Sequence, residues 1–448
     1  MLNNLGRAYE IGRGCEKNLP KAFELYQKAA DLNHPSAMDS VGRFYFYGLA
    51  GEKDYDKAFY WYERAANKNV LMAMNSLAIC YENGYGCEKN LETAFQWYKK
   101  AAEAGYAVSM SNLGVCYKRG KGCEKNTELA LEWLYKAVEK NNAYAMYVLG
   151  FSYDKGEDLP KDPKLAVYWY EQAAQHGNTA SMNSLGIHYE KGLGCEKNLE
   201  KAFYWYEQAA KRGEIVAFNN VGLCYELGKG VEKDMEMAFQ WYQKAANAGN
   251  AVGYSNLGLC YEYGKGVEKD IEKAVYYYQK AADLGHPLAI SNLGLCYELG
   301  KGVEVDIEKA YALYEKAANL GSSAAMNNLG LSYEYCKPER RNFDKAFYWY
   351  QKSAELGNIN AVINLGTCYE HGKGVEKDEK KAFELYKQAA DMKNANGIRM
   401  LGWAYEKGIG CEKNEEMAFN LYQEASNLNF LPATVSLGIC YEIGRAHV

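Results

Sequence analysis

The chain has 448 residues, of which 48% are hydrophobic and 24% are charged, and its formal net charge is −5. Binding to nucleic acid requires a concentrated basic surface, and this composition supplies none. No run of apolar residues is long enough to insert into a membrane as a spanning helix. Nucleic-acid-binding and membrane-spanning proteins are therefore excluded at this stage.

One tyrosine recurs every 36 residues along the chain, and we call it the register tyrosine. Leu or Val lies four residues before it at every position, and Gly follows that residue everywhere except at Ala78. A repeat of this length overrides the two to four domains that the chain length alone would suggest. The register tyrosines are Tyr9, Tyr45, Tyr81, Tyr117, Tyr153, Tyr189, Tyr225, Tyr261, Tyr297, Tyr333, Tyr369, Tyr405 and Tyr441.

Each repeat predicts two helices. In the first helix, apolar residues recur at spacings of three and four, as at Ala217, Val221, Cys224 and Tyr225. In the second helix, Ala238 and Tyr242 belong to one broad apolar face. The recurring Gly in the first helix costs about 1 kcal/mol relative to Ala, so it predicts a close approach to a neighbouring helix.

Both ends of the second helix are marked in the sequence. Asp or Asn precedes it in all twelve repeats, and these are favoured N-cap residues. The position after the second helix requires a left-handed backbone conformation, and Gly or Asn occupies it in every repeat except the one with Lys393. The Gly-x-Gly loop between the helices lacks the Lys-Ser/Thr of a P-loop and is interpreted as a turn. The expected N-caps are Asn18, Asp54, Asn90, Asn126, Asp162, Asn198, Asp234, Asp270, Asp306, Asn342, Asp378 and Asn414.

Neither helix can bury its apolar face alone, so stacked neighbours must bury it together. The sequence therefore predicts an all-α solenoid of 36-residue helix-turn-helix repeats, forming a single domain of about twelve repeats over residues 1–443. Residues 444–448 leave the repeat and are expected to be a non-native tail. No polar capping repeat is present at either end, so we expect a fragment whose uncapped ends allow self-association.

The repeat resembles the Sel-1-like family, a branch of the tetratricopeptide-like solenoids, over essentially the whole chain. The resemblance implies a right-handed superhelix and a scaffold or adaptor role. Some secreted, cysteine-rich relatives imply an alternative, a β-lactam-binding or hydrolase-like activity. In those relatives the cysteines pair near the small residues that close each repeat, whereas this chain has Ala-Ala there. The matching unit is Leu257-Gly258-x-x-Tyr261-x-x-Gly264-x-Gly266-Val267-x-x-Asp270-x-x-Lys273-Ala274, closed by Ala281-Ala282.

Reactive side chains form no pattern typical of an enzyme. The 13 cysteines are an odd number, which argues against a disulfide framework, and most are interpreted as small buried side chains. Cys336 replaces a loop glycine and is expected to be exposed. The six histidines occupy unrelated repeat positions. We therefore predict no catalytic residue, metal or cofactor, and the odd cysteine count with the lack of Asn-x-Ser/Thr favours a cytoplasmic location.

By register from the tetratricopeptide-like relatives, four rows of the first helices are expected to line a concave groove. They lie two residues before and two after the Leu of the repeat, and one and two after the register tyrosine. An apolar row beside a Glu row predicts a peptide or partner protein of basic and apolar character. The alternative is that the Glu row is a solvated face and the Leu row is partial core. The predicted groove residues are Asn219, Leu223, Glu226, Leu227, Leu259, Glu262, Tyr263, Leu295, Glu298, Leu299, Asn327, Glu334 and Trp403.

Overall fold

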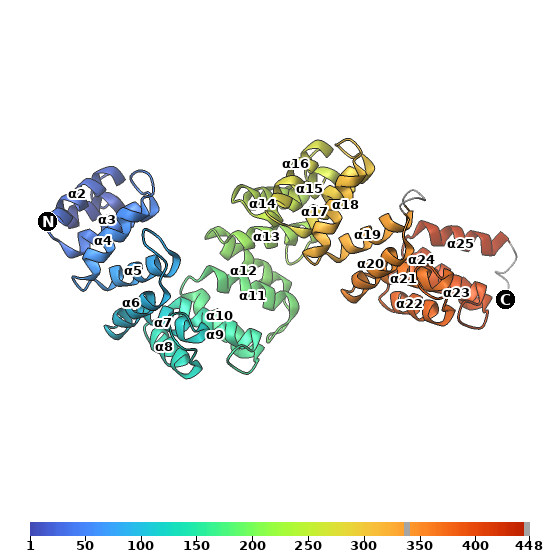
Figure 1. Ribbon diagram of the computed structural model, residues 1–448, viewed down its shortest axis with the longest axis horizontal. Helices are drawn as coiled ribbons and strands as arrows, with labels where there is room; N and C mark the ends of the chain where they lie inside the picture. Colours follow the sequence, from blue (N-terminus) through green and yellow to red (C-terminus); the bar gives the residue numbers. More distant parts are fainter. Residues whose placement is uncertain (336–340, 443–448) are drawn as a thin grey trace. The chain divides into compact units, whose positions relative to one another are not determined.

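The computed structural model describes residues 1–335 and 341–442, and every regular element in these ranges is an α-helix. First and second helices of the repeats alternate along the chain (Figure 1), which confirms the predicted all-α solenoid. The first helices are α1 (Leu2–Ile11), α3 (Pro35–Tyr47), α5 (Leu71–Asn83), α7 (Ala107–Arg119), α9 (Ala143–Lys155), α11 (Thr179–Lys191), α13 (Ile215–Leu227), α15 (Ala251–Tyr263), α17 (Pro287–Leu299), α19 (Ser323–Tyr335), α21 (Ile359–His371), α23 (Ala395–Lys407) and α25 (Leu431–Glu442). The second helices are α2 (Leu19–Asp31), α4 (Tyr55–Ala66), α6 (Leu91–Glu103), α8 (Thr127–Glu139), α10 (Pro163–Gln175), α12 (Leu199–Lys211), α14 (Met235–Asn247), α16 (Ile271–Asp283), α18 (Ile307–Asn319), α20 (Phe343–Glu355), α22 (Glu379–Asp391) and α24 (Glu415–Asn427).

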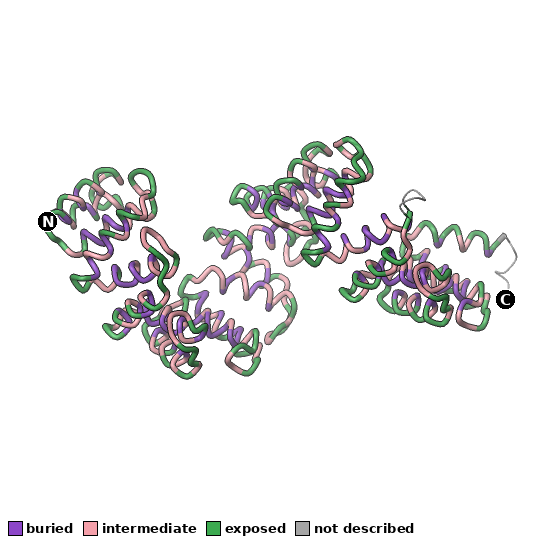
Figure 2. Tube along the Cα trace, in the orientation of Figure 1, coloured by how far each residue is buried: buried purple, intermediate pink, exposed green. Residues whose placement is uncertain are grey.

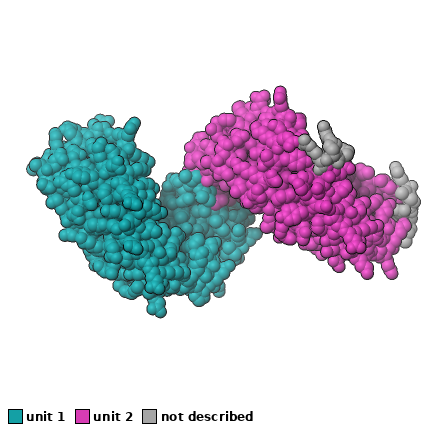
Figure 3. All heavy atoms as spheres, viewed as in Figure 1, with its two compact units in different colours: residues 1–217, 229–232 teal, residues 218–228, 233–448 magenta. Residues whose placement is uncertain are grey.

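The chain forms two compact units (Figure 3). Unit 1 consists of residues 1–217 and 229–232, and unit 2 of residues 218–228 and 233–448. Within each unit, successive helices pack against one another, and their facing sides carry the buried residues (Figure 2). The single domain over residues 1–443 stays a prediction, and both Cys336 and the expected tail at 444–448 lie outside the described residues.

The predicted helix ends are confirmed. All twelve N-cap side chains accept a hydrogen bond from a backbone N–H in the first turn; Asp270, for example, accepts from Lys273 N at 2.9 Å. The residue expected in the left-handed conformation has a positive φ in every repeat. This includes Lys393, the exception by residue type, at φ 57°. Each second helix is therefore bounded by local hydrogen bonds and backbone geometry that the sequence encodes directly.

Two glycines of the typical repeat allow close backbone approach. In α15, a Cβ at Gly258 would lie 2.4 Å from ring atoms of Tyr278, which α16 contributes to the same repeat. In the next loop, Gly266 has φ 67°, and a Cβ there would lie 1.9 Å from the carbonyl oxygen of Met235 in the preceding repeat. The first glycine thus lets the helices of one repeat pack closely, as predicted, and the second lets consecutive repeats stack.

A tyrosine from each of nine second helices donates a hydrogen bond to the carboxylate that follows the register tyrosine, at 2.6–2.9 Å. Tyr278 and Glu262 are a typical pair, in which both side chains are buried. Burial raises the pKa of Tyr278, and the hydrogen bond to the Glu262 carboxylate raises it further, so the hydroxyl keeps its proton. The pairs are Tyr26–Glu10, Tyr98–Glu82, Tyr206–Glu190, Tyr242–Glu226, Tyr278–Glu262, Tyr314–Glu298, Tyr350–Glu334, Tyr386–Glu370 and Tyr422–Glu406.

Among the described residues, five of these nine carboxylates use their second oxygen to accept from a lysine in the Gly-x-Gly loop of the following repeat. The lysine lies 39 residues after the glutamate, and the two connect consecutive repeats. We call this Tyr–Glu–Lys arrangement the carboxylate ladder. Its ion pairs are Lys121–Glu82, Lys229–Glu190 and Lys265–Glu226 at 2.6 Å, Lys373–Glu334 at 2.7 Å and Lys301–Glu262 at 3.4 Å.

One repeat carries the ladder with its charges reversed. Lys118 occupies the glutamate position, and the residue 39 positions later is Glu157, whose carboxylate lies 3.8 Å from the lysine. The neighbouring Asp158 has φ 64° and pairs with Lys118 at 3.3 Å. Leu134 replaces the tyrosine, as expected, because an ammonium group cannot accept a hydroxyl proton. The loop at residues 154–162, in which Glu157 and Asp158 follow the first loop glycine, is thus the matching half of a charge exchange.

The close contact of Gly258 with Tyr278 predicts that Gly258→Ala destabilises the fold. Overpacking should cost about 1–3 kcal/mol, partly offset by about 1 kcal/mol of helix propensity, so the midpoint of chemical denaturation should fall. Gly438→Ala is the matched control, because a Cβ at this position of the same motif meets no atom within 4 Å. It should leave the midpoint unchanged or raise it. Equal losses in the two variants would show that the tyrosine contact does not explain the glycine.

The ladder predicts unequal effects of two changes at Glu262. Glu262→Ala leaves the buried Tyr278 hydroxyl without its acceptor and should cost about 2–3 kcal/mol of unfolding free energy. Glu262→Gln keeps an acceptor and should cost less than half as much. Glu268→Ala, at an exposed loop glutamate of the same repeat, serves as the control and should be close to neutral. Urea denaturation followed by circular dichroism measures all three, and a loss from Glu262→Ala no larger than from Glu268→Ala would disprove the role of the ladder.

Candidate functional site

The predicted groove rows occupy different depths in the structure. In the first row, Asn219 and Asn327 are buried, so they lie within the packing between helices rather than on an open surface. Asn219 donates to Asn250 Oδ1 at 3.0 Å, and Asn327 accepts from Asn364 at 2.9 Å. Their amides join neighbouring elements of unit 2 and do not themselves form a surface for a partner.

The predicted acidic row is the carboxylate ladder. Glu262 and Glu334 are 8% and 6% exposed, and Lys301 and Lys373 neutralise them. Although burial acts to raise the pKa of Glu226, hydrogen bonds from Lys265 and Tyr242 outweigh it and leave the pKa lowered. Glu298 accepts from Tyr314 and, at 3.3 Å, from Ser332. Glu226, Glu262 and Glu334 are therefore paired with lysines of the same chain and offer little unbalanced negative charge to a ligand.

The two apolar rows do form a surface in unit 2. The side chains two residues after the register tyrosine are exposed by 53% at Leu227, 63% at Tyr263, 55% at Leu299 and 70% at Tyr335. The leucines four residues before them are partly buried or exposed beside this row. We call this surface the leucine face. Its residues are Leu223, Leu227, Leu259, Tyr263, Leu295, Leu299, Leu331 and Tyr335.

Trp403 is half-buried, and its indole N–H donates to Glu370 Oε1 at 3.3 Å. The loop lysine expected 39 residues after Glu370 is replaced by Ile409, which is buried. At the other end of the chain, Glu10 has Leu49 at the corresponding position, and Arg43 pairs with Glu10 at 2.7 Å. Arg43 and Trp403 occupy the same repeat position. Each donates a hydrogen bond to the glutamate whose loop lysine is missing, Glu10 and Glu370 respectively. Trp403 therefore has a structural partner in addition to its predicted place on the groove.

In the unit 1 helices α7, α9 and α11, the position of the outer leucine row carries a charge. Arg119, Lys155 and Lys191 are exposed and lie two residues after consecutive register tyrosines. Sequence reasoning did not single out these residues. A comparison of this one position between repeats would have found them, because the repeat places equivalent positions on corresponding faces.

The described cysteines are all free. The seven that precede a register tyrosine are buried, as interpreted from the sequence, while those of the loops are half-buried. Burial raises the pKa of Cys260 to about 12 and that of Cys296 to about 11. Thiols with so high a pKa carry almost no thiolate at neutral pH and are poor nucleophiles.

A Ser-x-x-Lys sequence, typical of β-lactam-acylating enzymes, occurs at residues 152–155 and escaped the sequence reasoning above. Ser152 is buried, accepts from Lys118 Nζ at 2.7 Å and donates to the Val148 carbonyl. The motif lysine, Lys155, pairs instead with Asp154 at 3.0 Å. Because the serine is enclosed and Lys118 is paired with acidic groups, this arrangement does not resemble an accessible nucleophile and base.

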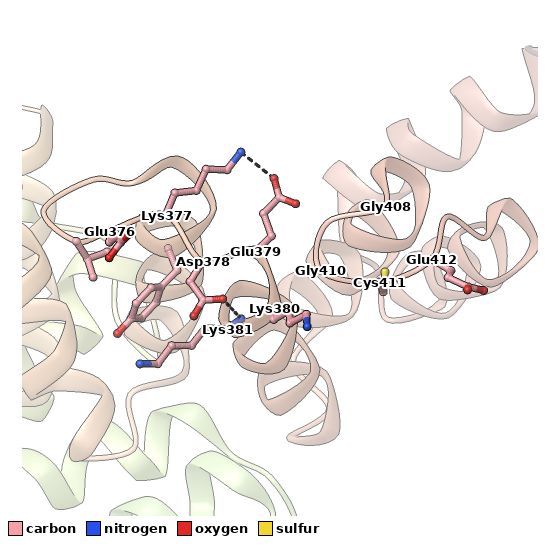
Figure 4. A pocket seen from close by; sticks show the side chains of 12 residues that line it. Glu376, Lys377, Asp378, Glu379, Lys380, Lys381, Gly408, Gly410, Cys411 and Glu412 are labelled. Atoms are coloured by element: carbon pink, nitrogen blue, oxygen red, sulfur yellow. Dashed lines mark hydrogen bonds and ion pairs between the residues drawn. The ribbon is translucent and has the colours of Figure 1, made fainter.

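A hollow of about 1050 Å³ lies at the loops that precede α22 and α24 (Figure 4). Its charged side chains serve local structure: Lys377 pairs with Glu379 at 2.7 Å, and Asp378 caps α22. The Cys411 thiol at its wall has a pKa raised by burial and donates to a backbone carbonyl. The hollow thus brings together no reactive pair.

Among residues 1–335 and 341–442, no three His, Cys, Asp or Glu side chains are arranged to hold a metal ion. Within the same ranges, no helix combines the length and the apolar character needed to cross a membrane.

The Sel1 repeat model matches the chain twelve times, at residues 1–34, 35–70, 71–106, 107–142, 143–178, 179–214, 217–250, 251–286, 287–322, 323–358, 359–394 and 395–430. No protein with a curated description matches the sequence. Among solved structures, c5321, a protective antigen of uropathogenic Escherichia coli with an SLR fold, is 31% identical over 94% of this chain and 90% of that one, with a TM-score of 0.64.

Two other solved structures are similar over less of this chain. A Sel1 repeat protein from Oxalobacter formigenes is 29% identical over 69% of this chain and 89% of that one, with a TM-score of 0.49. Cysteine rich protein B of Helicobacter pylori is 34% identical over 29% of this chain and 92% of that one, with a TM-score of 0.24. With twelve matched repeats and this helical architecture, the chain belongs to the Sel1 repeat family.

Proposed function

We propose that the chain is a protein-interaction scaffold and that the leucine face of unit 2 binds an apolar segment of a partner protein. Sel1 repeat solenoids generally serve as scaffolds for protein–protein interaction rather than as enzymes. The observation that carries the proposal is the exposure of Leu227, Tyr263, Leu299 and Tyr335 at one position of four consecutive repeats. Large apolar side chains that gather on an exposed surface mark interaction sites.

The pairing within the carboxylate ladder bears on the character of the partner. The sequence predicts a basic partner on the expectation that the glutamate row presents open negative charge. In unit 2, however, Lys265, Lys301 and Lys373 already pair with that row. The leucine face itself has no charged side chain, so hydrophobic contacts support an apolar partner more strongly than charge steering supports a basic one.

The ladder also decides which substitutions can test binding. Reversing Glu226, Glu262 and Glu298 to lysine would remove the acceptors of three tyrosine hydroxyls and disturb the fold. The exposed side chains of the leucine face can be changed with little effect on the core. They therefore separate a loss of binding from a loss of folding.

The test selects peptides from a random display library on the purified chain and measures the affinity of the selected peptides by fluorescence anisotropy. We expect peptides rich in apolar residues, whose affinity changes little with salt. A variant with Leu227→Ser, Tyr263→Ser, Leu299→Ser and Tyr335→Ser should bind them at least about tenfold more weakly. Circular dichroism should show unchanged helicity.

The matched control removes exposed tyrosines from second helices of the same unit. Tyr276→Ser with Tyr348→Ser changes side chains of similar exposure on α16 and α20 and should leave the affinity unaltered. Equal binding by the leucine-face variant and the wild type would refute the proposed site. Selection of lysine- and arginine-rich peptides whose binding collapses with salt would instead favour the acidic interpretation of the ladder row.

A further inference from the structure

A second surface, on the first helices of unit 1, carries basic side chains. Arg119 of α7, Lys155 of α9 and Lys191 of α11 occupy one position of three consecutive repeats, and all three are exposed. We call this the basic face. It lies within unit 1 and does not depend on the proposed role of the leucine face.

Two of these cations have no carboxylate partner in the part of the chain that the structure describes. Among the described residues, neither Arg119 nor Lys191 has an acidic group within 4 Å, whereas Lys155 pairs with Asp154 at 3.0 Å. Asp154 is shared with His188, whose Nε2 lies 3.3 Å away. The positive charge of the face is therefore only partly balanced by its own helices.

The carboxylates around the face are already engaged. Glu82 and Glu190 belong to the ladder and pair with Lys121 and Lys229 at 2.6 Å. Asp158 pairs with Lys118 and Lys125. The charge of Glu214 acts on Tyr147 of this surface, and its carboxylate accepts a hydrogen bond from Thr179 Oγ1 at 2.8 Å. The Thr179 hydroxyl leaves the charge of Glu214 unbalanced, but Arg119, Lys155 and Lys191 outnumber Asp154 and Glu214, so the face keeps a net positive charge.

Aromatic side chains lie beside the cations. Arg119 lines a cavity of about 80 Å³ together with Tyr144, Tyr147 and Phe151 of α9. The rings of Tyr144 and Tyr147 stack with centroids 6.3 Å apart, and Lys155 Nζ lies 5.7 Å from the centre of the Phe151 ring. A ligand here can thus bury apolar surface on the rings while it pairs with the cations.

We propose that the basic face binds an acidic peptide segment of a partner protein, in which Asp or Glu side chains alternate with aromatic or other apolar ones. The carboxylates pair with Arg119 and Lys191, and an apolar side chain covers Tyr144 and Phe151. Because each of the three first helices contributes one cation, the face suits an extended segment that crosses successive helices.

The experiment uses three labelled synthetic peptides that differ only in their polar residue: alternating Glu and Phe, alternating Gln and Phe, and alternating Lys and Phe. Fluorescence anisotropy with the full chain measures each at low and high salt. We expect the Glu peptide to bind at least about tenfold more tightly than the Gln peptide, and this preference to fade as salt rises. The Lys peptide should bind most weakly.

Variants locate the site. Arg119→Glu with Lys191→Glu should weaken the Glu peptide at least about tenfold, and the milder Arg119→Gln with Lys191→Gln should weaken it less. The control, Lys68→Glu with Lys140→Glu, makes the same change in net charge at exposed lysines of unit 1 that have no ion pair among the described residues. It should bind like the wild type, as should the leucine-face variant.

Several outcomes would overturn the proposal. These are tighter binding of the Lys or Gln peptide, equal losses in the Arg119/Lys191 variants and the Lys68/Lys140 control, and loss only in the leucine-face variant. Binding of a single-stranded oligonucleotide that competes with the Glu peptide at lower concentration would also overturn it, by assigning the face to nucleic acid. Preserved helicity in each variant ensures that a lost signal reports binding rather than unfolding.

Discussion

The hydrogen bond from a buried tyrosine hydroxyl to a glutamate carboxylate is the constraint on which the rest of the structure depends. Glycine at positions such as Gly258 lets the Tyr278 ring lie against the first helix of its repeat. The hydroxyl, once buried, requires an acceptor, and Glu262 supplies it at 2.6 Å. The carboxylate then requires a further donor, which Lys301 supplies from the next repeat. Packing within a repeat and stacking between repeats are thereby coupled through one side chain.

Substitutions in the ladder keep its hydrogen bonds or replace them with packing. The exchange of Lys118 and Glu157 preserves an ion pair with its direction reversed. At Phe46 the equivalent pair is aromatic, since its ring meets Tyr85 edge to face at 5.5 Å. Arg43 and Trp403 supply donors where the loop lysine is missing, and they do so from the same repeat position. The fold therefore accepts several kinds of side-chain pair at the ladder position, provided that each polar group there has a partner.

Much of the fold could be predicted because its signals are local. The N-cap at Asp270 bonds a backbone N–H three residues away, and left-handed residues such as Asn33 directly follow a helix. The predicted acidic groove depended on contacts that local spacing does not reveal. Glu226 looks open beside Leu227, yet its lysine lies 39 residues later and approaches only when repeats stack. The recurring spacing was present in the sequence, but its meaning required the geometry of the loop. Asn219 was placed on the surface for the same reason, although its amide is buried between helices.

Because the ladder neutralises its own glutamates, the position two residues after the register tyrosine decides much of the surface chemistry of a first helix. This position contributes little to the ladder and can vary without breaking it. In α7, α9 and α11 it carries cations, whereas in α13, α15, α17 and α19 it carries leucine or tyrosine. The same backbone thus presents a basic face in unit 1 and an apolar one in unit 2, and neither requires a change in the helices beneath. Structural and binding demands fall on adjacent residues, Glu262 and Tyr263 for instance, which point to different environments on one helix. A repeat solenoid can therefore diversify its partners by changing one residue per repeat while its packing stays the same.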